Sequence, residues 1–566
     1  MYVKRTVRRR GDKEYTYLSL VEAVRVEGKN RQVELLRLGE VGELERSGQL
    51  DRIIEALTKY AKGEWLEASS LEGAGAPSFG AVAAVAAYFD KIGLRHHFGR
   101  VGDQRGSVNL ADAVFVMVAN RLCDPASKRR TILEWSETIE LPDDMELPSL
   151  DRCYRALDAL CDAKEETEQA LYARLTDLAN LDLRLALYDL TSTYFETAAG
   201  PSEDFSSRDY GYSRDKRGDR PQVVIGLLVT GNGIPIAHYV FPGNTRDSTT
   251  LGVVMADYQR RFGIGRIALV ADRGLISEAN LDQVQAAGFD HVLATRLHRD
   301  PEVAAVLDRA ASETAQWVEV TPTTTATEVF HDTTRYVVVD SAPRRTRDDH
   351  RRQELLSRTE EKLLALAERV RRGRLADPAK IGAAADRILR DSGVGRCFSI
   401  AIGQGVFHWD YDGAALDYEE RLLAGRYVIT TSLSPEEAST AAVVRHYKML
   451  QAVERRFRVM KDFLALRPVF HRTERRVRGH IALCVIAATI EAVMAEDLAQ
   501  AGVMDPDLTD QVLTPRRALA QLGEIRRHRL HAGRDIDVVD RPTALQRAIL
   551  DAFGVDTTGW NKAKIA

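Results

Sequence analysis

Two aspartates stand among residues that otherwise favour β-strands. Asp189 lies within the run Leu187–Thr191, although Asp is depleted in strands. Asp272 directly follows Ile267–Ala271, at the carboxyl end of a predicted buried strand, where α/β sheets usually place their ligands. Either acid alone could simply cap the turn that follows its strand. Two such acids in one predicted sheet favour a functional site.

A third acid, Glu454, lies on a predicted helix among basic residues. Tyr447 and Lys461 stand seven residues before and after it, and seven residues make almost two full helical turns. The three side chains are therefore predicted to share one helix face, with Arg458 one turn beyond Glu454. A simpler interpretation of Glu454 is a surface ion pair with these basic neighbours.

Together, Asp189, Asp272 and Glu454 would form a cluster of oxygen ligands, which suits Mg²⁺ or Mn²⁺ better than zinc. Two such ions can activate the attacking oxygen and stabilise the leaving oxygen in phosphodiester displacement. Nearby Arg and Lys side chains would then hold the phosphates of the substrate. The pattern indicates a nuclease or a polynucleotidyl transferase.

Other chemistries lack their sequence motifs. The chain has no G-x-x-x-x-G-K-[ST] loop, no His-x-x-x-His and no G-x-S-x-G. P-loop, zincin-type and hydrolase-elbow mechanisms are therefore disfavoured, and no nucleotide cofactor is expected.

The elements that must position the three acids follow an α/β order. Strands are predicted at residues 183–195, 223–230, 234–241, 267–271, 291–297 and 427–431, and helices at 249–262 and 277–287. This order indicates a mixed sheet with helices. A further helix is predicted to begin at Ser434, with Pro435 in its first turn, and to continue to about Leu464. Residues 301–425 interrupt the pattern with Thr/Val-rich strands and one charged helix near Arg351–Arg372.

The flanking segments differ in character. Tyr15–Leu20 and Gln32–Leu38 alternate apolar and polar residues around a Gly-containing turn, which predicts a hairpin. Residues 72–78 have the composition of a linker, and residues 80–180 carry apolar groups at helical spacing.

Charge is segregated along this chain of 566 residues, whose net charge is only −4. Glu134–Glu168 holds twelve acidic and three basic residues, a net of −9, whereas Ala441–His480 holds eleven basic and three acidic, a net of +8. The acidic total first suggests that nucleic acid is not a partner. The basic segment around Glu454 reverses that inference, because binding depends on where charge lies.

Length and composition indicate a globular protein of several domains. Five scattered cysteines without a C-x-x-C pair argue against disulfides or a zinc knuckle and fit a reducing compartment. The basic start lacks the apolar segment of a secretion signal, and Ile481–Val493 is too short to span a bilayer. We therefore expect a cytoplasmic protein without a membrane partner.

Four segments of the chain resemble the DDE transposases of bacterial insertion sequences. They are Leu187–Glu196, Phe241–Asn244, Ala271–Gly274 and Tyr447–Lys461. Their order and spacing are most similar to the insertion-sequence-four superfamily, whose third acid lies in a Tyr-Arg-Glu-Lys signature. Leu450 stands where that signature has Arg, and Arg455 or Arg458 could supply its charge from the same helix.

Further residues are similar to the sixteen-thirty-four group of that superfamily. They are Arg121, Leu122, Pro125, Ser127, Lys128 and Trp135 before the core, and Arg467, Pro468 and His480 after it. The similarity covers about residues 1–530.

The resemblance implies an α/β fold with an RNase H-like core, interrupted by a β-rich insertion and flanked by helical N- and C-terminal domains. Asp189, Asp272 and Glu454 would be its catalytic, metal-binding triad. Residues expected to bind DNA are Tyr447, Lys461, Arg458, Arg455, Lys448, Asn244 and Arg273. The expected domains are a small β-containing module (1–75), a helical DNA-binding domain (76–180), the first part of the core (181–300), the β-rich insertion (301–425), the second part of the core (426–475) and a C-terminal helical region (476–566).

The implied activity is Mg²⁺-dependent cleavage of DNA at the ends of a mobile element, followed by strand transfer to target DNA. Mn²⁺ would substitute for Mg²⁺, and a homodimer would hold the two ends in a bacterial cytoplasm, at the nucleoid. Two alternatives stay open: a catalytically inactive, repurposed transposase that acts as a DNA-binding repressor, and a structural protein whose three acids are merely surface pairs.

Overall fold

The computed structural model of the chain describes most of its residues. The described residues are 1–11, 13–26, 29–58, 60, 72–106, 109–179, 185–196, 205–262, 268–271, 281, 284, 286, 288–295, 301–531, 535–558 and 560. The chain divides into two compact units. The first comprises residues 1–76, 528–538 and 561–566, and the second comprises residues 77–527 and 539–560.

The first unit is built from two small antiparallel sheets. The predicted hairpin is present as β2 (Lys13–Val26) and β3 (Lys29–Glu40), and a strand not predicted from the sequence, β1 (Tyr2–Arg10), pairs with β2. Helices α1 (Val41–Ser47) and α2 (Gln49–Thr58) follow. The second sheet joins β4 (Glu72–Gly75) to β16 (Arg527–His531) and β17 (Asp535–Val539).

That second sheet corrects the expectation that residues 476–566 are all helical. Arg527–Val539 contains two strands, and its partner β4 lies in the segment expected to be a linker. Alternating apolar residues are too few in these short strands to distinguish them from loops, so only the pairing reveals them.

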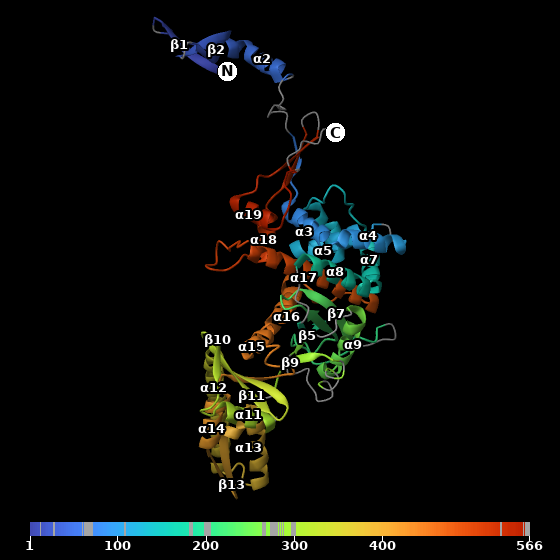
Figure 1. The fold of residues 1–566 in the computed structure, drawn as a ribbon, viewed down its shortest axis with the longest axis vertical. Coiled ribbons are helices and arrows are strands. Elements are labelled where there is room, and N and C mark those ends of the chain that lie inside the picture. The colour runs from blue at the N-terminus through green and yellow to red at the C-terminus, as the bar shows by residue number, and fades with distance from the viewer. Residues whose placement is uncertain are drawn as a thin grey trace. The chain divides into compact units, whose positions relative to one another are not determined.

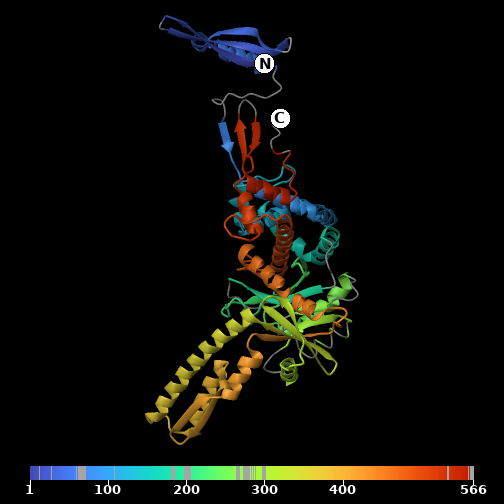
Figure 2. The same ribbon diagram turned by 60° about the vertical axis from the view of Figure 1, so that its left-hand side comes forward.

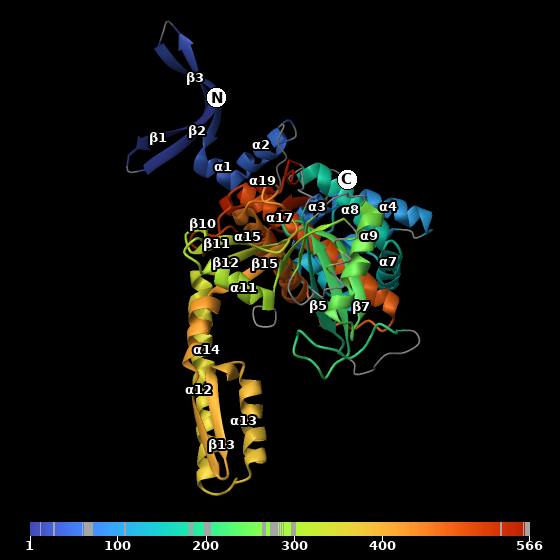
Figure 3. The same ribbon diagram turned by 60° about the horizontal axis from the view of Figure 1, so that its bottom comes forward.

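The second unit has at its centre a sheet with nine strands within the described residues (Figures 1 and 3). In spatial order the strands are β10 (Trp317–Thr321), β11 (Thr324–His331), β12 (Thr334–Ser341), β15 (Arg426–Thr431), β9 (Asp290–Ala294), β8 (Ala268–Ala271), β5 (Leu185–Tyr194), β6 (Gln222–Val229) and β7 (Pro235–Pro242). β5, β8 and β9 run parallel to one another and the remaining pairs are antiparallel, so the sheet is mixed, as the sequence predicted.

The two faces of the sheet pack against different helices. Leu185 and Leu187 belong to one hydrophobic core, shared with the helices α15 (Thr440–Lys448), α16 (Leu450–Arg458) and α17 (Glu474–Gln500). Ala186 and Tyr188 belong to another, shared with α9 (Leu251–Phe262), which follows the short 3₁₀ turn η3 (Asp247–Thr249). This division follows from the alternation of side chains along a strand.

Helices from both ends of the chain form one helical region. They are α3 (Gly80–Lys91), α4 (Leu94–Gln104), α5 (Leu110–Cys123), α6 (Lys128–Leu133), the 3₁₀ turn η2 (Trp135–Glu137), α7 (Leu150–Asp162), α8 (Lys164–Ala179), α17, α18 (Pro515–Leu522) and α19 (Ala544–Ala552). α17 contacts α5 and α7, and their apolar residues share a core with the sheet. The helices of the two segments that were expected as separate domains, 76–180 and 476–566, are therefore packed together.

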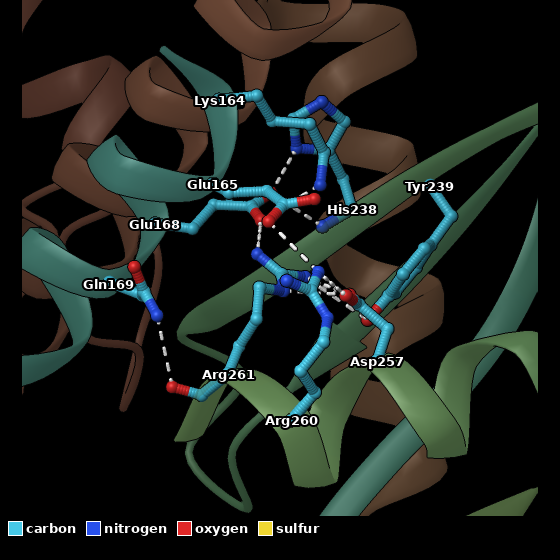
Figure 4. A network of polar contacts seen from close by, with 9 residues as sticks. All are labelled: Lys164, Glu165, Glu168, Gln169, His238, Tyr239, Asp257, Arg260 and Arg261. Carbon is cyan, nitrogen blue, oxygen red and sulfur yellow. Dashed lines mark hydrogen bonds and ion pairs between the residues drawn. The ribbon is translucent and has the colours of Figure 1, made fainter.

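A buried charge cluster attaches α8 to the sheet (Figure 4). Arg261 of α9 forms an ion pair with Glu168 of α8, and the Nδ1 atom of His238 on β7 lies 2.6 Å from Glu168. The His238 backbone N–H donates to the same carboxylate at 2.9 Å. Burial would raise the pKa of Glu168, but the surrounding His238, Lys164 and Arg261 outweigh it and lower that pKa.

The segment expected as one β-rich insertion, 301–425, is divided in the structure. α11 (Pro301–Ala310) and the strands β10 to β12 extend the central sheet, because β12 pairs with β15. Only residues 342–425 form a separate lobe, which is mainly helical. It contains α12 (Ala342–Arg371), α13 (Pro378–Ser392), η5 (Gly395–Cys397), the hairpin β13 (Phe398–Gly403) and β14 (Val406–Tyr411), α14 (Gly413–Tyr418) and the π-helical turn η6 (Glu419–Leu423).

The lobe has its own small hydrophobic core. Leu363 and Leu366 of α12 pack with Ile381 of α13 and Phe407 of β14. Figure 2 shows α12 as one long helix beside the hairpin. The buried residues of α12 recur three or four positions apart and so share one face, as in a helix that covers a single neighbouring layer; they are Thr359, Leu363, Leu366 and Val370.

Candidate active site

Asp189 lies on the face of the sheet that α16 covers. Side chains alternate along β5, and Leu185 and Leu187 belong to the core shared with α16, so Asp189 and Thr191 face the same way. Asp189 is half-buried. Its Oδ1 accepts a hydrogen bond of 2.7 Å from the Leu190 backbone N–H. Asp189 and Thr191 are therefore directed toward the helix α16.

The neighbouring parallel strand ends one residue before Asp272. Tyr188 on β5 pairs with Ala271 on β8, and these two residues directly precede Asp189 and Asp272 in the sequence. Asp272 and Arg273 themselves lie outside the described residues.

Glu454 is carried by α16, which packs against β5. Leu450, Val453 and Phe457 form the buried side of this helix, and Gly233 approaches it so closely that an added Cβ would lie 3.2 Å from the Cβ of Ala452. Glu454 is exposed. Its position, four residues after Leu450 and three before Phe457, is on the flank of the buried side.

A buried ion pair fixes the orientation of α16. Arg456 pairs with Glu491 of α17, and its guanidinium also donates to the backbone carbonyl of Ala488 at 3.3 Å. Both side chains are under 10% exposed, at 5% and 8%. Because Arg456 binds α17 and Val453 packs in the core, the rotation of Glu454 about the helix axis is determined.

The single helix predicted from Ser434 to Leu464 is wrong in two respects. Ser434–Glu437 forms a turn, in which the Ser434 backbone N–H donates to the Glu437 side chain at 2.9 Å, and α15 begins only at Thr440, with Ser439 as its cap. The helix is then interrupted at Met449 and passes into a π-helical turn, η7 (Val459–Phe463). A π turn takes up more residues than an α turn, so Lys461 does not continue the regular face of Glu454.

Lys461 instead binds an acid that the sequence interpretation missed. Its Nζ lies 2.7 Å from Oδ1 of Asp215, which also pairs with Arg467. Asp215 is 5% exposed at its side chain, and burial, ahead of the opposing effect of Asp215, lowers the pKa of Lys461. The only signal in the sequence was one acid between Arg214 and Lys216, and a contact across 246 residues cannot be predicted from that.

The other predicted DNA contacts differ in exposure. Arg455, Arg458 and Asn244 are exposed. Tyr447 is half-buried, with its ring centroid 5.6 Å from that of Tyr427. Lys448 donates to the Thr324 hydroxyl at 3.3 Å.

The Phe241–Asn244 motif forms a turn that packs tightly against a neighbouring loop. An added Cβ at Gly243 would lie 2.2 Å from the backbone oxygens of Asp209 and Gln222, so only glycine fits. The Gln222 side chain donates to the Gly243 carbonyl at 2.9 Å and to the Tyr212 carbonyl at 3.0 Å. The motif thus positions the 205–221 loop, which carries Asp215.

The described acids at this position offer oxygen ligands alone. Among the described residues, no group of three or more His, Cys, Asp or Glu side chains forms a metal-binding cluster. Asp189 and Glu454 are both carboxylates, a donor set that suits a hard divalent cation. The third expected ligand, Asp272, is the one outside the described part of the chain.

The sequence matches two protein families. The family described as "Transposase DDE domain" matches residues 188–490, which include Asp189, Asp272 and Glu454. The chain belongs to the DDE transposases. The "IS1634 family transposase, N-terminal domain" matches residues 3–69 of this transposase, so the resemblance stated above is confirmed for both the family and its group. None of the curated proteins compared with the transposase matches it.

Membership in the DDE transposases accounts for the α/β core of the protein. A DDE domain implies an RNase H-like core, and the family generally acts on DNA with divalent metal ions. In the described part of the transposase, no helix is long and apolar enough to cross a membrane.

Proposed function

We propose that this transposase cuts DNA at the ends of its own mobile element and joins the freed 3′-OH to target DNA, using Mg²⁺. The observation that supports this most directly is the placement of α16, the helix of Glu454, against the β5 face toward which Asp189 points. Asp272 would complete the triad from the end of β8. Mn²⁺ would substitute, because it prefers the same oxygen ligands.

The three carboxylates would hold the metal ions. Divalent ions bound there would activate the attacking oxygen and stabilise the leaving one. Asp189 is held in place by the Leu190 N–H, and the Arg456–Glu491 pair holds the helix of Glu454. The exposed Arg455 and Arg458 would bind backbone phosphates, with Tyr447, Lys448, Lys461, Asn244 and Arg273 as further DNA contacts.

No ATP is required, because one phosphodiester bond forms as another breaks. The 3′-OH oxygen released at the element end attacks a target phosphorus atom, and the target 3′-oxygen leaves with the electron pair of its P–O bond. A homodimer would bring two ends together at the bacterial nucleoid, and residues 76–180 with the basic N-terminus would recognise the ends.

The test is cleavage of duplex DNA that carries the inverted repeats flanking the gene. Asp189→Asn, Asp272→Asn and Glu454→Gln should each reduce nicking by more than about 100-fold, since even loss of a residue behind a metal ligand costs 10- to 100-fold. Gel-shift affinity for the same DNA should remain. Asp386→Asn, on the exposed surface of the 342–425 lobe, is the matched control and should nick as the wild type does.

Full cleavage by Asp189→Asn would contradict the assignment of Asp189 to the metal-binding triad. DNA binding by the wild type without any Mg²⁺-dependent nicking would favour the repressor instead.

A further inference from the structure

Several motif residues that lie outside the triad converge on one cavity. A space of about 410 Å³ is lined by Arg121 of α5, Lys128 of α6, Tyr154 of α7, His480 of α17 and, between helices, Arg467. Arg467 stands in the segment that follows η7. The cavity therefore lies between the helical region and the chain that leaves the candidate active site.

Arg121 brings a buried positive charge to this cavity. It is 5% exposed. Its guanidinium donates to three backbone carbonyls, those of Ala126 at 2.9 Å, Ala465 at 3.0 Å and Leu464 at 3.1 Å. Its Nε is buried without a hydrogen-bond partner among the described residues. Carbonyl oxygens satisfy donors but do not neutralise the charge.

Lys128 is the more unusual residue. It is 4% exposed, and no hydrogen bond or ion pair joins its ammonium group to any described residue. Burial, and then the nearby Arg121, lower its pKa. A buried ammonium without a partner is costly, because burial removes its hydration. The cavity that it lines is where a partner would lie.

The rest of the cavity wall adds no negative charge. The lining residues include no Asp or Glu. Nδ1 of His480 is buried and unpartnered within the described chain. Burial, and then Lys128 and Arg121, lower the pKa of His471 to about 3. Arg121 and Lys128, which have no carboxylate partner among the described residues, and two imidazoles thus line a cavity that has no Asp or Glu on its wall.

A larger cleft elsewhere in the protein differs from this cavity, because acidic residues line it together with the basic ones. It measures about 740 Å³ and is also lined by arginines, but Asp162 is among its lining residues. There Arg475 pairs with Asp162, and Arg105 lies 3.4 Å from the same carboxylate. The charges of Arg475 and Arg105 in that cleft are already compensated by Asp162, whereas no carboxylate compensates Lys128 among the described residues.

We infer that the cavity at Lys128 binds a phosphate group, with the Lys128 ammonium as its direct ligand and Arg121 as a fixed charge behind it. Hydrogen bonds between ionised partners are the strong ones. Arg467 and Arg130 also line the cavity, but each already pairs with carboxylates, Arg467 with Asp215 and Arg130 with Glu134 at 3.3 Å. Lys128 is therefore the residue on which the site depends.

The expected source of the phosphate is a DNA strand, a part of the inference that rests on the proposed function. Phe470, 67% exposed, and Tyr154 contribute aromatic surface to the same cavity. Aromatic side chains beside cations are typical of sites that hold a nucleotide by base stacking and phosphate contact together.

The experiment compares full-length wild type with Lys128→Met, which removes the charge but keeps a long side chain. Lys380→Met, on the exposed face of α13, is the matched control. Thermal unfolding is measured in sodium phosphate and in sodium chloride of equal ionic strength. Phosphate should raise the unfolding temperature of the wild type and of Lys380→Met more than that of Lys128→Met, in which only the general stabilisation by phosphate salts remains. Without phosphate, Lys128→Met should be at least as stable as the wild type, because it removes an unpaired buried charge.

Fluorescence anisotropy with a labelled DNA duplex tests the source. Lys128→Met should bind about tenfold more weakly or worse, as expected for loss of a hydrogen bond to a charged group, while Lys380→Met should bind as the wild type does. Equal DNA affinity with a lost phosphate response would overturn DNA as the source and identify a free phosphate compound. A wild-type phosphate response in Lys128→Met would overturn the site itself.

Two further variants separate a folding defect and a loss of cleavage from a loss of phosphate binding. If Lys128→Met does not fold, Lys128→Gln is used, which keeps a polar side chain without the charge. Asp189→Asn should retain the phosphate response while losing nicking. Failure of the proposed cleavage and failure of the phosphate site are thus separate results.

Discussion

At the scale of single residues, adjacent side chains have opposite environments. Arg455 and Arg456 follow Glu454 directly in the sequence, yet Arg455 is exposed and Arg456 forms a buried pair with Glu491. One helical step of about 100° separates a surface cation from a structural one. The two arginines therefore serve as controls for each other.

Arg456→Met should lower the free energy of unfolding by about 3–5 kcal/mol, because it leaves Glu491 buried without its partner. Nicking should fall with it, since the pair holds the helix of Glu454. Urea unfolding and the cleavage assay measure the two effects. If Arg456→Met unfolded at the wild-type urea concentration, the pair would not hold α16.

Arg455→Met should leave the urea midpoint unchanged, as expected for an exposed position. It should weaken DNA binding similarly for all sequences and reduce the slope of log K against log salt by about 1, corresponding to one lost phosphate contact. Binding measured at several salt concentrations gives that slope. An unaltered slope would remove Arg455 from the DNA contacts.

At the scale of elements, turns and buried charges join parts that are distant in the sequence. The turn at Gly243 holds the 205–221 loop, and the Glu168 cluster joins α8 to β7 and α9. Neither feature includes one of the three acids, and both fix the positions of the elements that they join.

Gly243→Ala should destabilise the transposase by about 1–3 kcal/mol, the usual cost of forcing extra atoms into a packed site. The added Cβ would meet two backbone oxygens, which cannot move as a side chain does. Gly218→Ala, with no atom within 4 Å of its added Cβ, is the control and should be as stable as the wild type or more so. Thermal unfolding compares them, and equal losses would contradict the packing argument.

Glu168→Gln should cost about 1.5–3 kcal/mol at neutral pH, because Arg261 and His238 lose hydrogen bonds to a charged carboxylate while Arg261 keeps its pair with Asp257. The pKa of Glu168 is lowered in the folded protein, so its stabilising contribution is fully present above the unfolded pKa of about 4.3 and is lost as pH falls below it. The difference between variant and wild type should therefore shrink below about pH 4.3. Urea unfolding across pH measures it.

The control for this cluster is Glu165→Gln on the same helix. Glu165 pairs with Arg260, and both side chains are more than half exposed. Exposed pairs contribute little, so this variant should match the wild type at every pH. A difference that stayed constant into acid for Glu168→Gln would exclude ionisation as its cause.

At the scale of the whole molecule, the 342–425 lobe leaves and rejoins the sheet at neighbouring positions. Asp340 on β12 pairs with Arg426 on β15, and the Ser341 N–H donates to the Gly425 carbonyl at 3.0 Å. The lobe has a core of its own. The two strands thus form a hairpin into which the lobe is inserted.

Replacing residues 342–424 by Asn-Gly should yield a folded protein, since that dipeptide suits a tight hairpin turn. Some stability should be lost, about 1–3 kcal/mol for the packing of Leu423 alone, which belongs to the core beside β12. Circular dichroism and one cooperative unfolding transition would establish the fold. An unfolded product would show that the sheet needs the lobe.

Much of the central fold and the candidate site could be predicted from local sequence. The β-forming residues around Asp189 predicted β5, and the apolar run before Asp272 predicted β8. Both predictions depend on the residue types of a short segment, which needs no tertiary contact. The motif spacing also identified the family, which the matches confirm.

Tertiary structure alone decided the remaining features. Strands β10 to β12 belong to the central sheet because β12 pairs with β15, about ninety residues later in the chain. Lys461 lies in the π turn η7 and forms an ion pair with Asp215. Arg121 donates a hydrogen bond to the Leu464 carbonyl, 343 residues away in the sequence. Periodicity describes one face of one element, whereas these contacts depend on which distant faces pack together. The sequence by itself therefore determined the family and the two strands β5 and β8, on which the predicted positions of Asp189 and Asp272 depend. Packing decided which basic residues remain exposed and which are buried in ion pairs or beside a cavity.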